Sequence, residues 1–280
     1  MIDIKHALTQ AIALLAPASP SAQIDAEILL THTLGVSRSF LYTHPEKQLE
    51  HTQVDTYQKL IAKRYEGLPI AYLTGSREFW SMPLHLNEET LIPRPETELL
   101  VELALSLLKD VSSAAILDLG TGSGAIALAL ASERTDWRLL ASDVSQAAVD
   151  IARRNAHRLG LANVQVVCSD WFSAIPLQQF HAIVSNPPYI AEDDPHLKQG
   201  DLRFEPQQAL VSGADGLAAL TQIIKHSYDR LLPGGLLLLE HGYQQKPAVT
   251  TLLSHYGYIK VQCWPDWQGM DRVSGGWRKH

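Results

Sequence analysis

The fold of this chain is decided by residues 115–131, which read AILDLGTGSGAIALALA. An apolar run, a glycine-rich turn and a helix-forming run of alanine and leucine follow one another, as in a strand–turn–helix unit of a parallel sheet. The turn carries Gly120, Gly122 and Gly124 at every second position. Glycines permit a tight turn and let a ligand approach the backbone closely. We therefore predict a ligand-binding turn after a strand over Ala115–Leu119.

Short apolar runs alternate with helical patterns beyond this turn, which is typical of a parallel α/β sheet. Further strands are predicted at Trp137–Ser142, Val164–Cys168, Ala182–Ser185 and Leu236–Glu240. Helices are predicted between them at Ala125–Ser132, Gln146–Leu159 and Leu217–Leu231, and a final antiparallel pair at Tyr258–Trp264 and Val273–Arg278. Cys168 ends one of these strands and is expected to be a core residue rather than a nucleophile.

The first seventy or so residues carry helical patterns, with apolar residues at helical spacing from Ile4 to Leu15 and longer patterns at Ala22–Leu34 and Glu46–Tyr65. Two short β-like stretches that follow predict a hairpin. The predicted division is a helical domain over 1–70, a hairpin linker over 71–91 and an α/β domain over 92–280.

Composition narrows the class of protein further. A chain of 280 residues with 46% hydrophobic content is neither disordered nor larger than one or two domains. Its two cysteines cannot form a disulfide framework, and no run approaches the roughly 20 apolar residues of a membrane span. The net charge of −7 argues against broad attraction to nucleic acid or anionic lipid. We expect an acidic, cytoplasmic protein with no membrane contact.

The remaining basic residues and the histidines give little indication of function. Lys59, Lys63 and Arg64 form a modest basic face that we expect to be simply solvated. The 12 histidines show no zinc-ligand spacing, so no metal site is expected.

An acidic residue, Asp143, ends the second predicted strand roughly twenty residues after the glycine turn, where a carboxylate can accept ribose hydroxyls. Together they point to a ligand that contains adenosine. The glycines also match the dinucleotide pattern, so NAD remains a competitor. Asp118 disfavours a pyrophosphate but suits S-adenosylmethionine, which carries an ammonium and a sulfonium. Asp170 and Trp171 stand where this fold contacts an adenine, although a capping aspartate and a core tryptophan explain them equally well.

The tetrapeptide Asn186-Pro187-Pro188-Tyr189 follows the fourth strand of this series, and its two prolines prevent the strand from continuing. A planar NH2 group is a poor nucleophile because its lone pair is delocalised. The Asn186 side-chain oxygen and the Pro187 carbonyl can accept its N–H groups, orient its nitrogen and disperse the charge that develops. We predict Asn186 and Pro187 as catalytic, and all four residues as substrate-binding, with Tyr189 offering an aromatic face. No strong general base is needed.

The glycine loop and this tetrapeptide together resemble class I methyltransferases that act on planar nitrogens, including N6-adenine and N2-guanine enzymes. Three further segments narrow the resemblance: PRPETE at 93–98, RFEP at 203–206 followed by Ala209-Leu210, and LLEHG at 238–242. With the helical N-terminal part, they resemble the HemK/PrmC family, which methylates the glutamine of the Gly-Gly-Gln motif in class I peptide chain release factors. The resemblance covers essentially the whole chain.

The resemblance implies a Rossmann-like class I methyltransferase domain, with a mostly parallel seven-stranded sheet and an antiparallel C-terminal strand, preceded by a small helical bundle that helps to hold the release factor. It implies S-adenosyl-L-methionine as donor and S-adenosyl-L-homocysteine as product. The implied donor contacts are Gly120, Thr121, Gly122, Ser123, Gly124, Asp143, Trp171 and Asn186. We add Asp118 and Asp170 to them for their position and charge.

Other functions remain open at this point. The main alternative is an N6-adenine or N2-guanine methyltransferase acting on DNA or RNA, because the same tetrapeptide serves those bases. The net charge disfavours it, although composition leaves room for a local basic groove. A pure binding module and an NAD-dependent dehydrogenase are weaker candidates. Arg94, Glu96 and Glu240 either shape the site or brace the structure. We expect a monomer with a protein substrate and no direct nucleic-acid partner.

Overall fold

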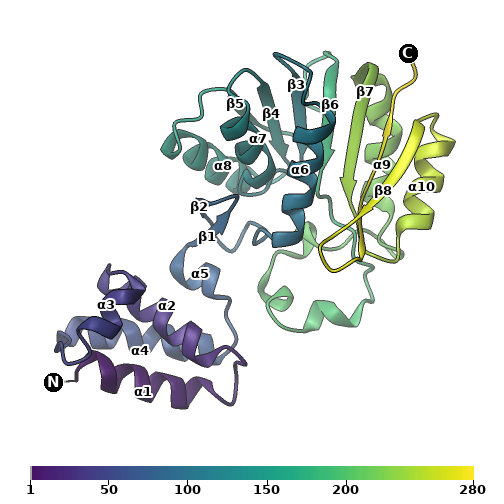
Figure 1. The fold of residues 1–280 in the computed structure, drawn as a ribbon. Helices are drawn as coiled ribbons and strands as arrows, with labels where there is room; N and C mark the ends of the chain where they lie inside the picture. The colour runs from purple at the N-terminus through teal and green to yellow at the C-terminus, as the bar shows by residue number, and fades with distance from the viewer. Residues whose placement is uncertain (1) are drawn as a thin grey trace. The chain divides into compact units, whose positions relative to one another are not determined.

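The computed structural model describes residues 2–280, and these form two compact units (Figure 1). The helical unit comprises the chain up to Ser76 together with His196–Phe204. The α/β unit comprises Arg77–Pro195 and Glu205–His280. The hairpin that follows the helices therefore belongs, from Arg77 onward, to the α/β unit.

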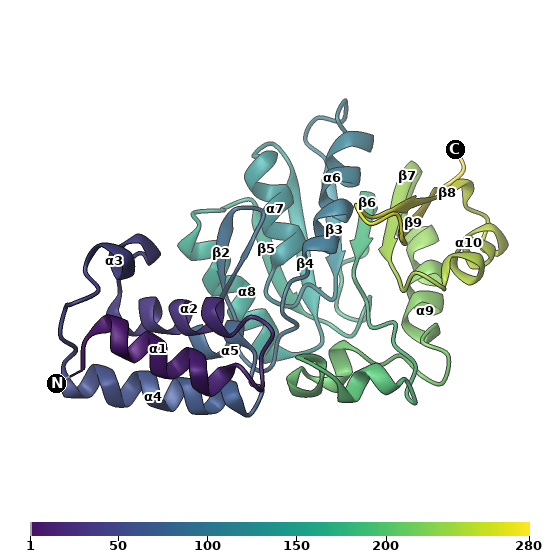
Figure 2. The ribbon, with the colours of Figure 1, turned by 60° about the horizontal axis from the view of Figure 1, so that its bottom comes forward.

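Five helices build the helical unit: α1 (Ile4–Leu15), α2 (Ala22–Leu34), α3 (Arg38–Thr43), α4 (His51–Tyr65) and α5 (Ile70–Thr74). Helices α1, α2 and α4 lie side by side (Figure 2) and bury a core of their own that includes Leu15, Leu29 and Tyr57. The predicted helix over 46–65 begins only at His51, because Glu50 and Gln53 form a capping box there.

Arg64 in this unit corrects the prediction of a solvated basic face. Its side chain is only 14% exposed, and its Nε donates to Asp25 Oδ2 at 2.7 Å. Helix α4 packs on α2, which carries Asp25, so the arginine braces two helices instead of facing solvent. Arg203 Nη2 also donates to the Glu66 carbonyl at 3.0 Å, which ties the segment His196–Phe204 to this unit.

The α/β unit contains a two-stranded hairpin and a seven-stranded sheet in the order β5-β4-β3-β6-β7-β9-β8. The hairpin strands are β1 (Ser76–Phe79) and β2 (Met82–His85). The sheet strands are β3 (Ala115–Leu119), β4 (Arg138–Asp143), β5 (Val164–Cys168), β6 (Phe180–Ser185), β7 (Leu231–Glu240), β8 (Ile259–Pro265) and β9 (Asp271–Trp277). Strand β9 pairs antiparallel with both β7 and β8, while β3 to β7 pair in parallel. The predicted mostly parallel sheet with an antiparallel C-terminal strand is confirmed.

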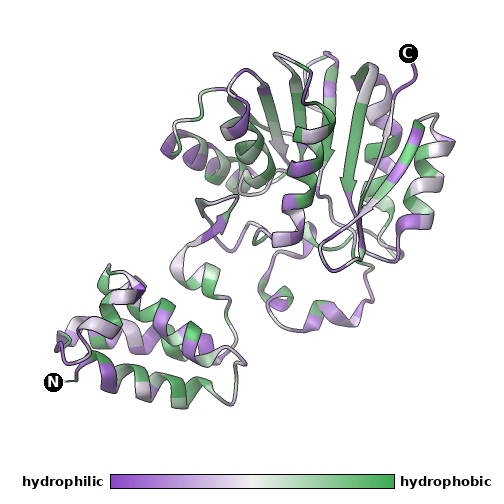
Figure 3. Ribbon diagram, viewed as in Figure 1, coloured by the Kyte–Doolittle hydropathy of each residue, from purple (hydrophilic) through white to green (hydrophobic). Residues whose placement is uncertain are grey.

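Helices cover both faces of the sheet (Figures 1 and 2). One face carries α6 (Glu98–Leu107), α7 (Ala125–Glu133) and α8 (Gln146–Arg158), and the other carries α9 (Ala218–Ser227) and α10 (Lys246–His255). Neighbouring strand residues alternate between the two cores: Ile116 packs in the first and Leu117 in the second. The central strands are therefore apolar along most of their length (Figure 3).

Three local expectations differ from the structure. The helix predicted to end at Leu231 ends at Ser227, because a 3-10 turn follows and β7 already begins at Leu231, which pairs with Phe180. Helix α10 was not expected. Cys168 is exposed instead of lying in the core, because it is the last residue of β5, the edge strand of the sheet. Between Ile2 and His280, no helix is long and apolar enough to cross a bilayer.

Candidate active site

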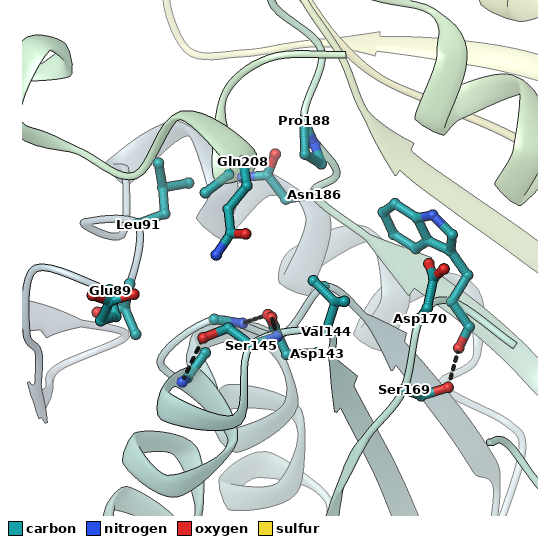
Figure 4. Close-up of a pocket in the computed structure, with 16 residues that line it drawn as sticks. Glu89, Leu91, Asp143, Val144, Ser145, Ser169, Asp170, Asn186, Pro188 and Gln208 are labelled. Carbon is teal, nitrogen blue, oxygen red and sulfur yellow. Dashed lines mark hydrogen bonds between the residues drawn. The ribbon is translucent and has the colours of Figure 1, made fainter. Parts of the chain in front are cut away.

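A cavity of about 140 Å³, partly open to solvent, lies where the parallel strands end (Figure 4). Register brings the strand ends together, since Leu119 of β3 lies opposite Ser142 of β4 and Ser185 of β6. Seven predicted site residues line the cavity: Gly120, Gly122, Asp143, Asp170, Trp171, Asn186 and Pro188. Thr121, Ser123, Gly124, Asp118, Pro187 and Tyr189 lie next to them in the chain but are not part of its lining.

The glycine turn has three left-handed residues, with φ of 71° at Gly120, 55° at Gly122 and 92° at Gly124. A Cβ atom at Gly122 would meet nothing within 4 Å, whereas one at Gly124 would stand 2.8 Å from Leu128 Cδ1. The two glycines thus have different reasons to be glycine. Gly122 leaves room beside the cavity, and Gly124 lets α7 pack closely behind the turn.

Asp143 connects β4 to the glycine turn. Its Oδ2 accepts from the Gly122 N–H and its Oδ1 from the Ser145 N–H, both at 2.9 Å (Figure 4). Burial raises the pKa of Asp143, and these backbone N–H groups oppose that shift by stabilising the carboxylate. Each oxygen keeps a further lone pair, so the side chain can also accept two hydroxyls of a ligand.

Asp118 lies behind the turn and is fully buried. Its Oδ2 accepts from Thr121 Oγ1 at 2.6 Å and from the Ala127 N–H at 3.2 Å, while its Oδ1 has no hydrogen-bond partner among the described residues. Burial raises the pKa of Asp118 to about 7. The side chain therefore braces the turn from the protein interior.

Asn155 on α8 supports the same turn from another direction. Its Nδ2 donates to the Ser123 carbonyl at 2.9 Å and to the His85 carbonyl at 3.0 Å, and its Oδ1 accepts from the His85 N–H at 2.9 Å. One buried amide thus joins α8, the glycine turn and the hairpin.

The tetrapeptide places Asn186 and Pro188 on the side of the cavity opposite Asp143 and Ser145 (Figure 4). Asn186 Nδ2 donates to Thr97 Oγ1 at 3.1 Å, so its Oδ1 stays available as an acceptor. Tyr189 donates its hydroxyl to Glu240 Oε1 at 3.2 Å, and its carbonyl accepts from Gln245 Nε2 at 2.9 Å. Burial raises the pKa of Tyr189, so its hydroxyl stays protonated. Glu240 is thus linked to the tetrapeptide.

Two segments were missed by the sequence reasoning. Glu89, Thr90 and Leu91 line the cavity from the stretch after β2, and Gln208 with Ala209 line it from the 3-10 turn Gln207–Ala209. The four other unpredicted lining residues, Val144, Ser145, Ala148 and Ser169, directly follow strand ends or begin a helix.

An ion pair with a buried carboxylate brings those two segments together. Arg94 pairs with Glu205, whose Oε2 also accepts from the Ile92 N–H at 3.1 Å. The motifs around Arg94 and Glu205 were visible in the sequence, but their partnership was not. Arg94 thus braces one wall of the site.

The charge of the cavity discriminates between ligands. Three carboxyl groups line it, those of Glu89, Asp143 and Asp170, and its lining contains no lysine, arginine or histidine. A dinucleotide pyrophosphate would meet three acidic side chains and no cationic one there, whereas a cationic ligand meets complementary charge. With the open glycine cradle and the Trp171 indole, the residues present fit S-adenosylmethionine better than NAD.

Known proteins match nearly the whole of this chain. Residues 6–75 match the PrmC N-terminal domain and residues 96–203 the methyltransferase small domain. The release factor glutamine methyltransferase of Escherichia coli is 50% identical over 98% of this chain and 99% of its own length, and that of Shewanella oneidensis is 48% identical over 98% and 95%. The chain belongs to this family. The predicted HemK/PrmC membership is confirmed, because both relatives match 98% of this chain.

Solved structures share the fold of this family member at much lower identity. A Thermus thermophilus 16S rRNA N2 G1207 methyltransferase, solved with AdoMet and guanosine, is 20% identical with a TM-score of 0.56 and covers 73% of this chain and 50% of its own. A methyltransferase from Pyrococcus furiosus is 19% identical with a TM-score of 0.54 and covers 80% and 98%. Both support the class I methyltransferase fold.

Proposed function

We propose that this chain transfers a methyl group from S-adenosylmethionine to the side-chain amide nitrogen of the glutamine in the Gly-Gly-Gln motif of class I peptide chain release factors. This modification aids translation termination. Family membership supports the substrate, since the relatives that match nearly the whole chain are release factor glutamine methyltransferases. One observation carries the chemistry: Asn186 stands at an acid-lined cavity with its Nδ2 bonded to Thr97 and its Oδ1 available as an acceptor.

On the donor side, the bound cofactor supplies a methyl group made electrophilic by its sulfonium. Asp143 is placed to accept ribose hydroxyls, and the Trp171 indole offers an apolar face for an adenine. Glu89 and Asp170 add negative charge that favours a cation. Gly120 and Gly122 leave the backbone open to the ligand. Asp118, Thr121, Ser123 and Gly124 do not line the cavity, and we propose that they shape the turn that holds the donor.

On the acceptor side, Asn186 Oδ1 and the Pro187 carbonyl accept the N–H groups of the glutamine amide and aim its nitrogen at the methyl group. The N–C bond forms as the C–S bond breaks, and the two acceptors stabilise the positive charge that develops on nitrogen. A proton then leaves to solvent, which gives methylated glutamine and S-adenosylhomocysteine. Pro188 and Tyr189 flank the amide, with Tyr189 held by Glu240.

We also propose that the protein works as a monomer in the cytoplasm, without direct nucleic-acid contact. A translation factor as substrate supports that compartment, and the net charge of −7 disfavours a polyanion. The helical unit, with its own core, is proposed to help hold the release factor.

Labelled S-adenosylmethionine tests the substrate class. The protein is incubated separately with a class I release factor, bulk RNA and duplex DNA. We expect label on the release factor alone. Label on RNA or DNA instead would support the nucleic-acid alternative and contradict the proposal.

A further inference from the structure

Two buried side chains connect the ends of the tetrapeptide. Thr97 accepts from Asn186 Nδ2 at 3.1 Å, and Glu240 accepts from the Tyr189 hydroxyl at 3.2 Å. Thr97 is 3% exposed and Glu240 is 1% exposed, so bulk water does not compete for these contacts. Glu240 Oε2 is buried without a hydrogen-bond partner among the described residues, and the nearby Thr97 hydroxyl lowers the pKa of this carboxyl.

The hydroxyl of Thr97 has one hydrogen to donate. Because its oxygen accepts from Asn186, that hydrogen is free for another group. The neighbouring Glu240 side chain, when ionised, offers only acceptors. A donor to this carboxylate also removes part of the cost of burying it. With Thr97 directed toward Glu240, Asn186 can meet Thr97 only with its N–H side. Its oxygen is then left for the substrate.

We propose that Thr97 and Glu240 are positioning residues that fix the amide of Asn186 with its oxygen toward the reacting nitrogen. The two ends of an amide are nearly equal in size, so packing alone does not choose between them. A flipped Asn186 would present N–H groups to the N–H groups of the substrate amide and would repel it. This inference rests on the proposed function and explains how the site favours an NH2 group over a carbonyl or ether.

The charge on Glu240 decides the direction of this hydrogen-bond chain. Burial raises the pKa of Glu240 to about 7, with Glu96 adding to the rise and Thr97, Arg272 and Tyr189 opposing it. The Arg272 guanidinium is shared with Asp266 at 3.2 Å. When protonated, Glu240 can itself donate to Thr97, and Thr97 can then donate to a flipped Asn186. Activity should therefore fall as the pH is lowered through this pKa.

Three variants separate this role from simple packing. Thr97→Val keeps the shape and removes the hydroxyl, Thr97→Ser keeps the hydroxyl, and Glu240→Gln replaces an acceptor with a group that can donate. We expect kcat on a release factor to fall about 100-fold in Thr97→Val and Glu240→Gln, the scale of a misplaced catalytic group. Thr97→Ser should recover most of that loss. S-adenosylhomocysteine affinity should change by less than about tenfold in all three.

A second readout needs no substrate. In the isotope-labelled full-length protein, the side-chain amide signals of Asn186, assigned with Asn186→Ala, should shift in Thr97→Val and Glu240→Gln and stay near the wild type in Thr97→Ser. Folded Thr97→Val protein with unchanged kcat or unchanged Asn186 signals would overturn the inference, as would Glu240→Gln with both readouts unchanged. A wild-type protein that does not methylate the release factor would instead contradict the proposed function, while the amide signals would still test Asn186 orientation.

Discussion

Two carboxyl groups at this site, those of Asp118 and Glu240, are buried away from water. Asp118 is the clearest case, because it is fully buried and one of its oxygens has no partner among the described residues. Its pKa is about 7 in the folded protein against an ordinary value of 3.8. The folded state therefore holds a proton that the unfolded chain has already released over this range. The contribution of Asp118 to the free energy of unfolding therefore falls as the pH rises from about 4 to about 7.

Asp118→Asn should remove this contribution to the pH dependence. In the wild type, one such group lowers the free energy of unfolding by up to about 1.4 kcal/mol per pH unit in this window. We expect the variant to lose less stability than the wild type between pH 4 and pH 8, measured by chemical denaturation at several pH values. Glu240 shifts in the same direction and leaves a residual slope. Parallel curves for the two proteins would show that Asp118 does not titrate in this way.

Substitution of Asn186 should slow methyl transfer and leave donor binding nearly unchanged. Asn186→Ala removes the side-chain acceptor for the substrate amide and leaves the glycine turn and Asp143 in place. We expect kcat to fall about 100-fold or more, as when one preorganised hydrogen-bonding group is removed from a transition state. The affinity for S-adenosylhomocysteine, measured by calorimetry on the same protein, should change by less than about tenfold. Near-normal turnover would exclude the proposed role.

The glycine turn must leave room for a ligand and must also pack closely against α7. Substitutions at Gly122 and Gly124 can separate these two requirements. Gly122→Ala places a methyl group beside the cavity, and Gly124→Ala places one against Leu128. We expect Gly122→Ala to weaken S-adenosylhomocysteine binding at least about tenfold. The strain of its left-handed backbone should also lower the free energy of unfolding by about 1–2 kcal/mol. Gly124→Ala should lower the free energy of unfolding by about 1–3 kcal/mol more than Gly122→Ala does, because its new methyl group crowds Leu128.

A matched control for this pair is Gly160→Ala. Gly160 has φ of 69° after α8, and a Cβ there would also meet nothing within 4 Å, but it does not line the cavity. This variant should show the strain of Gly122→Ala without the binding loss, as measured by thermal denaturation and calorimetry. Equal ligand affinity in Gly122→Ala and Gly160→Ala would contradict the assignment of Gly122 to the ligand cradle.

The sequence predicts those elements whose backbone geometry depends on local residue types. Strands β3 and β5 begin and end where predicted, and the glycine turn and tetrapeptide are recognisable, because backbone geometry dictates their residue types locally. Glu89 and Gln208 were missed because Glu89 lies in an irregular segment and Gln208 in a short 3-10 turn, and the Arg94–Glu205 pair joins these two parts of the chain. Arg64 was assigned to solvent for the same reason: its partner, Asp25, is on another helix. Tertiary pairing leaves no local pattern.

The molecule consists of two units with separate cores. Every residue that lines the cavity belongs to the α/β unit. A ligand that binds only the folded state stabilises the unit that holds it. S-adenosylhomocysteine at 100 times its dissociation constant should add about 2.7 kcal/mol and raise the melting temperature of the α/β unit by several degrees. NAD at the same concentration is the control, and an equal or larger shift with NAD would contradict the assignment of the cavity to S-adenosylmethionine and its product.

The proposed reaction delivers the methyl group to one glutamine of a release factor. The most direct measurement is tandem mass spectrometry of a class I release factor after incubation with this protein and S-adenosylmethionine, beside the same factor with the Gly-Gly-Gln glutamine replaced by alanine. We predict one added methyl group, located on the side-chain amide of that glutamine, and none on the substituted factor. Methylation at another residue, or equal methylation of both factors, would contradict the account.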